Sequence, residues 1–158
     1  MLGFPRVINE KAARTVAAVV AVAGAVALAT GAHWLLIPLA YGFWARVLAG
    51  PRLSPLALFA TKVAAPRLGP PREVAGPPKR FAQGMGAAMT TLGVIALALG
   101  WTTAVTVLLA MLVVAATLEA ALGLCIGCRV FAGLMRAGVV PETVCVECAD
   151  LSARLQRV

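Results

Sequence analysis

The sequence predicts an all-α, polytopic membrane protein, in which a four-transmembrane-helix bundle is followed by a short cytoplasmic tail that carries cysteines. Apolar residues make up 61% of the 158 residues and charged residues only 13%, whereas a soluble domain is nearer half apolar and a quarter charged. The apolar residues gather in runs long enough to cross a bilayer. All 4 cysteines follow the last of these runs.

Four apolar segments are expected to span the membrane: about 12–31, 34–48, 81–100 and 104–124. A helix rises about 1.5 Å per residue, so about 20 residues cross the hydrocarbon core. Very short, uncharged turns join the first segment to the second and the third to the fourth, so each of these pairs is expected to be antiparallel. Residues 1–124 are therefore predicted to form the membrane domain, and residues 125–158 the tail.

The long loop between the second and third spans is rich in proline and in basic residues. Residues 54–65 within it are predicted to form a short amphipathic helix, with Ser54 as its N-cap and Pro66 as its stop. Its expected apolar stripe consists of Leu56, Leu58, Phe59 and Val63. Two interpretations remain open: the helix lies on the membrane surface, or it packs on the bundle as an ordinary linker.

The positions of the basic residues predict the orientation in the membrane. Lys and Arg number 14 against 6 acidic residues, which gives a net charge of +8. They fall in the N-terminal segment, in the loop at 46–80 and in the tail. Four spans place these regions on one side, which the positive-inside rule makes cytoplasmic. We therefore expect a multi-pass protein of the cell's inner (plasma) membrane with both termini in the cytoplasm.

The expected partner of this basic surface is the bilayer itself. Basic residues next to membrane spans attract anionic lipid headgroups. Nucleic acid is not an expected partner, because the sequence has no basic helix with interleaved aromatic residues.

The cysteines form two C-x-x-C pairs, Cys125 with Cys128 and Cys145 with Cys148. Two such pairs at this spacing are typical of a metal site, because each presents two sulfurs at a turn and together they complete a tetrahedron. Structural disulfides are rare in the cytoplasm. Zinc, or else iron, bound by all four cysteines is therefore the first interpretation.

A redox-active dithiol is the second interpretation of the same cysteines. C-x-x-C motifs lower the pKa of a thiol, and Arg129, directly after Cys128, favours a thiolate. A helix that begins at Cys128 acts in the same direction through its dipole. Cys125 and Cys128 are the catalytic candidates under this interpretation.

Two further residues are functional candidates by position. Glu119 is the only acidic residue inside a predicted span, and intramembrane carboxylates often carry function. Pairing with Arg46, Arg80 or another base of the loop is the plain interpretation, and proton or ion transfer is the alternative. His33 lies at the outer turn, where an ordinary interfacial residue and a ligand both fit.

Four short segments form a distinctive combination: N-E-K-A-A-R at 9–14, S-P-L-A-L at 54–58, A-G-P-P-K-R-F-A at 75–82 and L-E-A-A-L-G-L-C-I-G-C at 118–128. Together they resemble a bacterial integral-membrane family catalogued as a domain of unknown function, over about residues 8–131. The resemblance implies a four-span protein with C-x-G-C after the last span. It implies that the following residues belong to the family pattern: Asn9, Arg14, Arg80, Phe81, Glu119, Cys125 and Cys128. Such proteins are similar to others encoded beside thioredoxin-like and sulfurtransferase proteins, which favours thiol or sulfur chemistry.

These observations lead to two main functional hypotheses. The first is an integral membrane component of thiol- or sulfur-linked chemistry, with a soluble thioredoxin-like or sulfurtransferase partner or a place in a larger membrane complex. The alternative is a non-enzymatic membrane subunit or anchor whose zinc-pinned tail docks a soluble partner. A small carrier that uses Glu119 is a third hypothesis. The sequence leaves open whether the protein is an enzyme.

Overall fold

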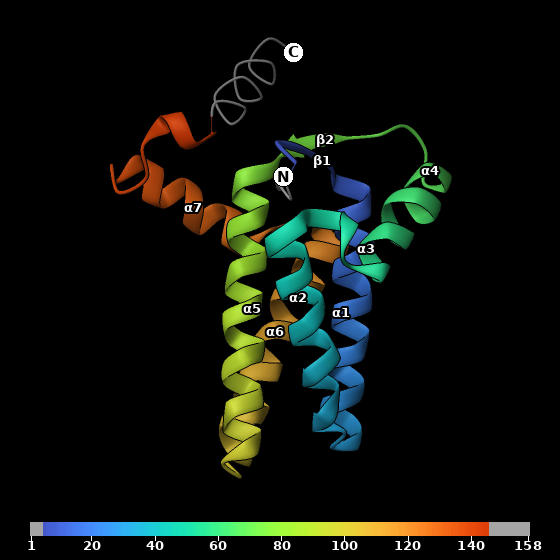
Figure 1. Ribbon diagram of the computed structural model, residues 1–158, viewed down its shortest axis with the longest axis vertical. Coiled ribbons are helices and arrows are strands. Elements are labelled where there is room, and N and C mark those ends of the chain that lie inside the picture. Colours follow the sequence, from blue (N-terminus) through green and yellow to red (C-terminus); the bar gives the residue numbers. More distant parts are fainter. Residues whose placement is uncertain (1–4, 146–158) are drawn as a thin grey trace.

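The computed structural model describes residues 5–145, and most of this range is helical (Figure 1). Its main elements are the helices α1 (Glu10–Thr30), α2 (Leu36–Ala49), α5 (Gly76–Ala98) and α6 (Thr102–Leu122). Helix α1 packs along α6, α2 packs along α5, and α5 also contacts α6. The bundle is thus closed by contacts between helices that are distant in the sequence.

Three of these helices, α1, α5 and α6, are long and apolar enough to cross a membrane. They coincide with three of the predicted spans. The predicted span at 34–48 falls on α2, which has 14 residues and follows a 3-10 turn at His33–Leu35. Glycines in unusual backbone conformations bound this segment, because Gly31 has a φ of 71° and Gly50 a φ of 62°. Helix α2 is therefore shorter than the about 20 residues of a typical span.

Small residues bring α5 close to α2. A Cβ atom on Gly86 would lie 2.3 Å from the ring of Phe43, and one on Gly93 would lie 3.1 Å from the side chain of Leu36. Helices in a membrane associate by such close packing, because lipid supplies no hydrophobic driving force. The outward faces expose large apolar side chains, such as Val22 and Met111, as expected of surfaces that meet lipid.

The loop after α2 is helical, as predicted for residues 54–65. Helix α3 (Pro55–Phe59) continues through a π-helical turn at Ala60–Ala64 into α4 (Ala65–Arg67). The Oγ atom of Ser54 accepts a hydrogen bond from Ala57 N (3.3 Å), so the N-cap is confirmed. The helix ends at Arg67, one residue beyond Pro66, so Pro66 lies in its last turn and not directly after it.

The buried face of this segment also differs from the prediction. Ala57, Ala60 and Ala65 are the residues that pack into the core against α1. Phe59, expected in the apolar stripe, is exposed. The small alanines occupy the buried face because they let the loop helix approach α1 closely, so the segment packs on the bundle. The position of its exposed face on the membrane surface stays a prediction.

A short β-ribbon departs from the all-α prediction. Strand β1 (Val7–Asn9) pairs antiparallel with β2 (Glu73–Ala75), with Ile8 opposite Val74. Each strand has 3 residues, too few for alternation of side chains to be visible in the sequence. The ribbon joins the N-terminal segment to the start of α5.

The chain leaves the bundle after α6. Gly123 ends α6 with a φ of 67°, and α7 (Ile126–Arg136) extends sideways from the end of the bundle (Figure 1). Phe131 of α7 is buried against Phe81 of α5, with ring centroids 5.6 Å apart. A 3-10 turn at Glu142–Cys145 follows. The rest of the predicted tail, with Cys148, lies outside the described residues.

Candidate functional site

The first C-x-x-C pair forms the start of α7. Cys125 is the N-cap residue, and its Sγ atom accepts a hydrogen bond from Cys128 N (3.2 Å). The two cysteines form a disulfide, with their Cα atoms 5.2 Å apart. The helix therefore begins at Ile126, two residues before Cys128. The sequence favoured a metal site first and a redox-active dithiol second at these cysteines, and in the structure the first pair is oxidised.

Gly127, between the two cysteines, fixes the position of the pair against the bundle. A Cβ atom on Gly127 would lie 2.6 Å from both Cα and Cβ of Ala82 in α5. Glycine thus lets the first turn of α7 contact the backbone of α5 directly. Cys125 is buried by this contact and Cys128 is half-buried.

The disulfide lies beside an open groove with a volume of about 750 Å³. Cys125 and Cys128 both line this groove, together with Arg129 and Lys79. Thiol–disulfide exchange requires access to a sulfur atom. The groove offers that access from outside the bundle.

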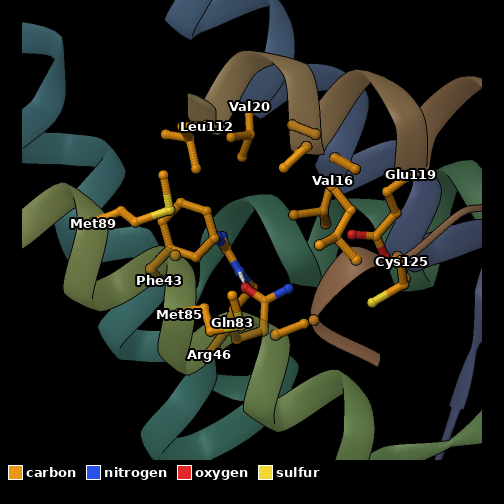
Figure 2. Close-up of a pocket in the computed structure, with 18 residues that line it drawn as sticks. Val16, Val20, Phe43, Arg46, Gln83, Met85, Met89, Leu112, Glu119 and Cys125 are labelled. Carbon is orange, nitrogen blue, oxygen red and sulfur yellow. Dashed lines mark hydrogen bonds between the residues drawn. The ribbon is translucent and has the colours of Figure 1, made fainter. Parts of the chain in front are cut away.

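Cys125 also lines a smaller cavity inside the bundle, with a volume of about 90 Å³ (Figure 2). Figure 2 shows Arg46 and Gln83 on one side of this cavity and Glu119 with Cys125 on another. Apolar side chains such as Phe43 form the remaining wall. The cysteine site thus adjoins both an outer groove and an inner polar cavity.

Glu119 is paired with a base of the loop region, as its plain interpretation predicted. The partner is Lys79 of α5, whose Nζ donates to Glu119 Oε1. The side chains of Lys79 and Glu119 are only 7% and 15% exposed, so the two charges stabilise each other away from water. Arg80, one of the partners expected, instead donates from Nε to the carbonyl of Val47 (3.1 Å). The hypothesis of proton or ion transfer by Glu119 stays a prediction.

The segment N-E-K-A-A-R has a positioning role. Asn9 caps α1 by accepting a hydrogen bond from Lys11 N (3.0 Å). Arg14 donates to the carbonyls of Ala120 (3.0 Å) and Ala121 (2.8 Å), which are free acceptors at the end of α6. A cation at a helix C-terminus also interacts favourably with the helix dipole. Arg14 therefore holds the end of α6 just before the chain reaches the cysteines.

The sequence suggested Arg46 as a partner of Glu119 but did not identify its pairing with Gln83. A long basic side chain near the end of a span can reach toward the interface. Arg46 instead points into the bundle, is only 5% exposed, and donates from Nε to Gln83 Oε1 (2.7 Å). The sequence feature that could have predicted this pairing is the presence of one polar residue on each of two spans, near the same membrane surface.

The predicted four-cysteine metal site stays untested. Cys145 is buried at the end of its 3-10 turn. Within residues 5–145, no three His, Cys, Asp or Glu side chains gather closely enough to hold a metal ion, and Cys148 lies outside this range. His33 begins the 3-10 turn between α1 and α2. The ligand role considered for His33 also stays a prediction.

The fold and the site define a helical protein with membrane-length helices and a C-x-x-C disulfide where the chain leaves the bundle. The chain belongs to the family described as a domain of unknown function (DUF4395), which matches residues 8–136. The matched range contains Cys125 and Cys128 and ends before Cys145. No curated protein and no solved structure matches the chain.

Proposed function

We propose that this protein is an integral membrane component that exchanges its Cys125–Cys128 disulfide with a soluble dithiol protein. The observation that carries the proposal is the position of that disulfide, at the N-terminus of α7 and on an open groove. The first cysteine pair also lies within the family domain, whereas the second lies beyond it. A thioredoxin-like protein is the proposed partner. A sulfurtransferase or a larger membrane complex is the alternative.

The exchange begins at Cys128, which is half-buried, whereas Cys125 is buried. A partner thiolate attacks Cys128 Sγ, the Cys125–Cys128 bond breaks, and Cys125 leaves as a thiolate. The second thiol of the partner then attacks the partner sulfur of the mixed disulfide, and Cys128 is released as a thiolate. The partner dithiol becomes a disulfide, and its two electrons and two protons reduce this pair to a dithiol.

The environment of Cys125 suits a leaving group. Its Sγ already accepts a hydrogen bond from Cys128 N, at the positive end of the helix dipole. A thiol with a low pKa leaves faster in such an exchange. Arg129, which lines the groove with both cysteines, adds positive charge beside the reacting sulfurs.

We also propose that α2 is a fourth span, so that both termini face the cytoplasm at the inner membrane. Ile37, Tyr41, Trp44 and Leu48 recur at helical spacing, and all four are exposed. They form one outward stripe suited to lipid. The basic N-terminal segment and the basic loop meet in the β-ribbon, so their charges gather at one end of the bundle and favour anionic headgroups there.

A trapping experiment tests the exchange. The full chain in detergent, as the Cys125→Ser variant, is mixed with a thioredoxin that lacks its resolving cysteine and whose remaining thiol is activated as a mixed disulfide with thionitrobenzoate. Cys128 is expected to displace the thionitrobenzoate and to form a mixed disulfide with thioredoxin that accumulates, because neither protein retains a second thiol to resolve it. The matched Cys128→Ser variant should trap at least tenfold less, because Cys125 is buried.

Two results would count against the proposal. Equal absence of a mixed disulfide in both variants would show that the pair does not react with dithiol proteins. One tightly bound zinc ion per wild-type chain, with all thiols unreactive, would support the non-enzymatic anchor with a zinc-pinned tail instead.

A further inference from the structure

The side chains in and around the inner cavity carry more positive than negative charge, because Arg46 and Glu119 line it and Lys79, which lines the neighbouring cavity, pairs with Glu119. Arg46, Lys79 and Glu119 lie at the same end of the bundle, and Glu119 is close enough to Arg46 to interact electrostatically. The carboxylate of Glu119 is already paired with Lys79. One positive charge is therefore left in excess, and it resides on Arg46, a residue that is only 5% exposed.

Such a charge is costly without a partner. Removing an ion from water costs several kcal/mol unless an opposite charge and hydrogen bonds replace the water. Across the described part of the chain, Arg46 forms a single hydrogen bond, from Nε, and no carboxylate lies within ion-pair distance of it. The ring of Phe43, 4.6 Å from Arg46 Cζ, offsets part of this cost but supplies no negative charge.

The polar groups of Arg46 and Gln83 that remain unbonded are all hydrogen-bond donors. Arg46 Nε–H can only donate, so the atom of Gln83 that it contacts must be the carbonyl oxygen. That bond leaves the terminal nitrogens of Arg46 and the amide N–H groups of Gln83 as the free donors of the pair. A site built from donors and one positive charge is complementary to an oxyanion.

The space beside these donors is of matching size. Arg46 and Gln83 line the inner cavity of about 90 Å³ and also a neighbouring cavity of about 250 Å³, which extends to the N-terminal segment and the loop. The inner volume holds several water molecules, or one anion of about five heavy atoms. Water can satisfy the hydrogen bonds there but leaves the charge uncompensated.

From this excess charge, these donors and this volume, we infer that Arg46 and Gln83 bind a small inorganic oxyanion inside the bundle. The larger cavity supplies its route from the loop side. The inference is independent of the proposed disulfide exchange, because it concerns Arg46 and Gln83 and not the cysteines. Cys125 and Glu119 line another side of the same cavity.

The test uses the full chain in detergent, with nitrate, hydrogencarbonate, phosphate and sulfate as probes. Potassium gluconate, which is too bulky for the cavity, keeps the ionic strength constant. At least one probe is expected to raise the midpoint of thermal unfolding in a saturable way, because a ligand of the folded state stabilises it. Calorimetry with that probe should show one site per chain.

Three variants assign the site. Arg46→Met should weaken binding at least tenfold. Gln83→Glu places a carboxylate beside Arg46 Nε, so it should raise the unfolding midpoint without anion and abolish the response to the probe. Lys62→Met, which removes an equal charge from an exposed residue, should respond as the wild type does.

The same measurements can overturn the inference. It is wrong if none of the four probes shifts the unfolding of the wild type. It is equally wrong if Gln83→Glu responds to the probe as strongly as the wild type, and this variant decides the question even if Arg46→Met fails to fold.

Discussion

The two ends of the bundle are built on different principles. The end near the short turns, which we term the apolar end, is packed by the buried residues Ala27, Leu36, Ala96, Val105 and Leu109. The opposite end, the polar end, contains the charged and amide side chains Arg46, Lys79, Gln83 and Glu119. The cavities beside the disulfide lie at the polar end. Packing alone explains the apolar end. The polar end is less stable than it could be because it buries charged side chains, as functional sites often do.

The largest effect is expected from Glu119→Gln at the polar end. This change leaves the buried ammonium of Lys79 without a carboxylate, which costs about 3–5 kcal/mol. The midpoint of thermal unfolding in detergent measures the loss. The control Glu73→Gln, at an exposed position of the ribbon, should change the midpoint little.

The double variant Lys79→Met with Glu119→Met sharpens this prediction. Replacing both partners with apolar side chains should recover most of the stability. If Glu119→Gln does not lower the midpoint, the pair does not stabilise the polar end. If the same variant is also silent for activity, the carrier hypothesis for Glu119 is removed.

A smaller effect, about 3 kcal/mol, is expected from Leu109→Ala at the apolar end. Leu109 is fully buried, so its truncation leaves a cavity. Trapping of the mixed disulfide should stay unchanged, measured at a temperature at which the variant is folded. A loss of trapping there would show that the two ends are coupled and that the contrast between them is wrong.

The smallest effect on stability is expected from Gly127→Ala, at about 2 kcal/mol. The new Cβ overlaps the backbone of Ala82, so the start of α7 must shift. Unlike Leu109→Ala, this variant should change the rate of mixed-disulfide formation. Gly133→Ala, in the same helix with open space around its Cβ, is the matched control and should leave that rate unaltered.

The sequence predicted what depends on local pattern. Three of the four predicted spans coincide with helices of membrane length, and Ser54 caps the loop helix as expected. The C-x-x-C pair was located at the end of the last span. Apolar runs, caps and motif spacing are properties of adjacent residues, so they are readable without a structure.

The sequence did not predict what depends on how the helices are rotated against one another. Depth along a span limits which residues share a level, but it does not show which of them face each other. For that reason Arg80 and Lys79, which are adjacent in the sequence, were not distinguished as partners of Glu119. The inward direction of Arg46 has the same cause. The ribbon between β1 and β2 was missed because it is short and joins distant segments.

Counting the thiols of the wild-type chain tests the central claim most directly. The purified protein is alkylated before and after incubation with reduced thioredoxin, and the modified peptides and the zinc content are quantified. The account predicts that two alkylated thiols appear after reduction, at Cys125 and Cys128, with no metal bound to them. The account is contradicted if both cysteines are zinc-bound and resist alkylation before and after the incubation.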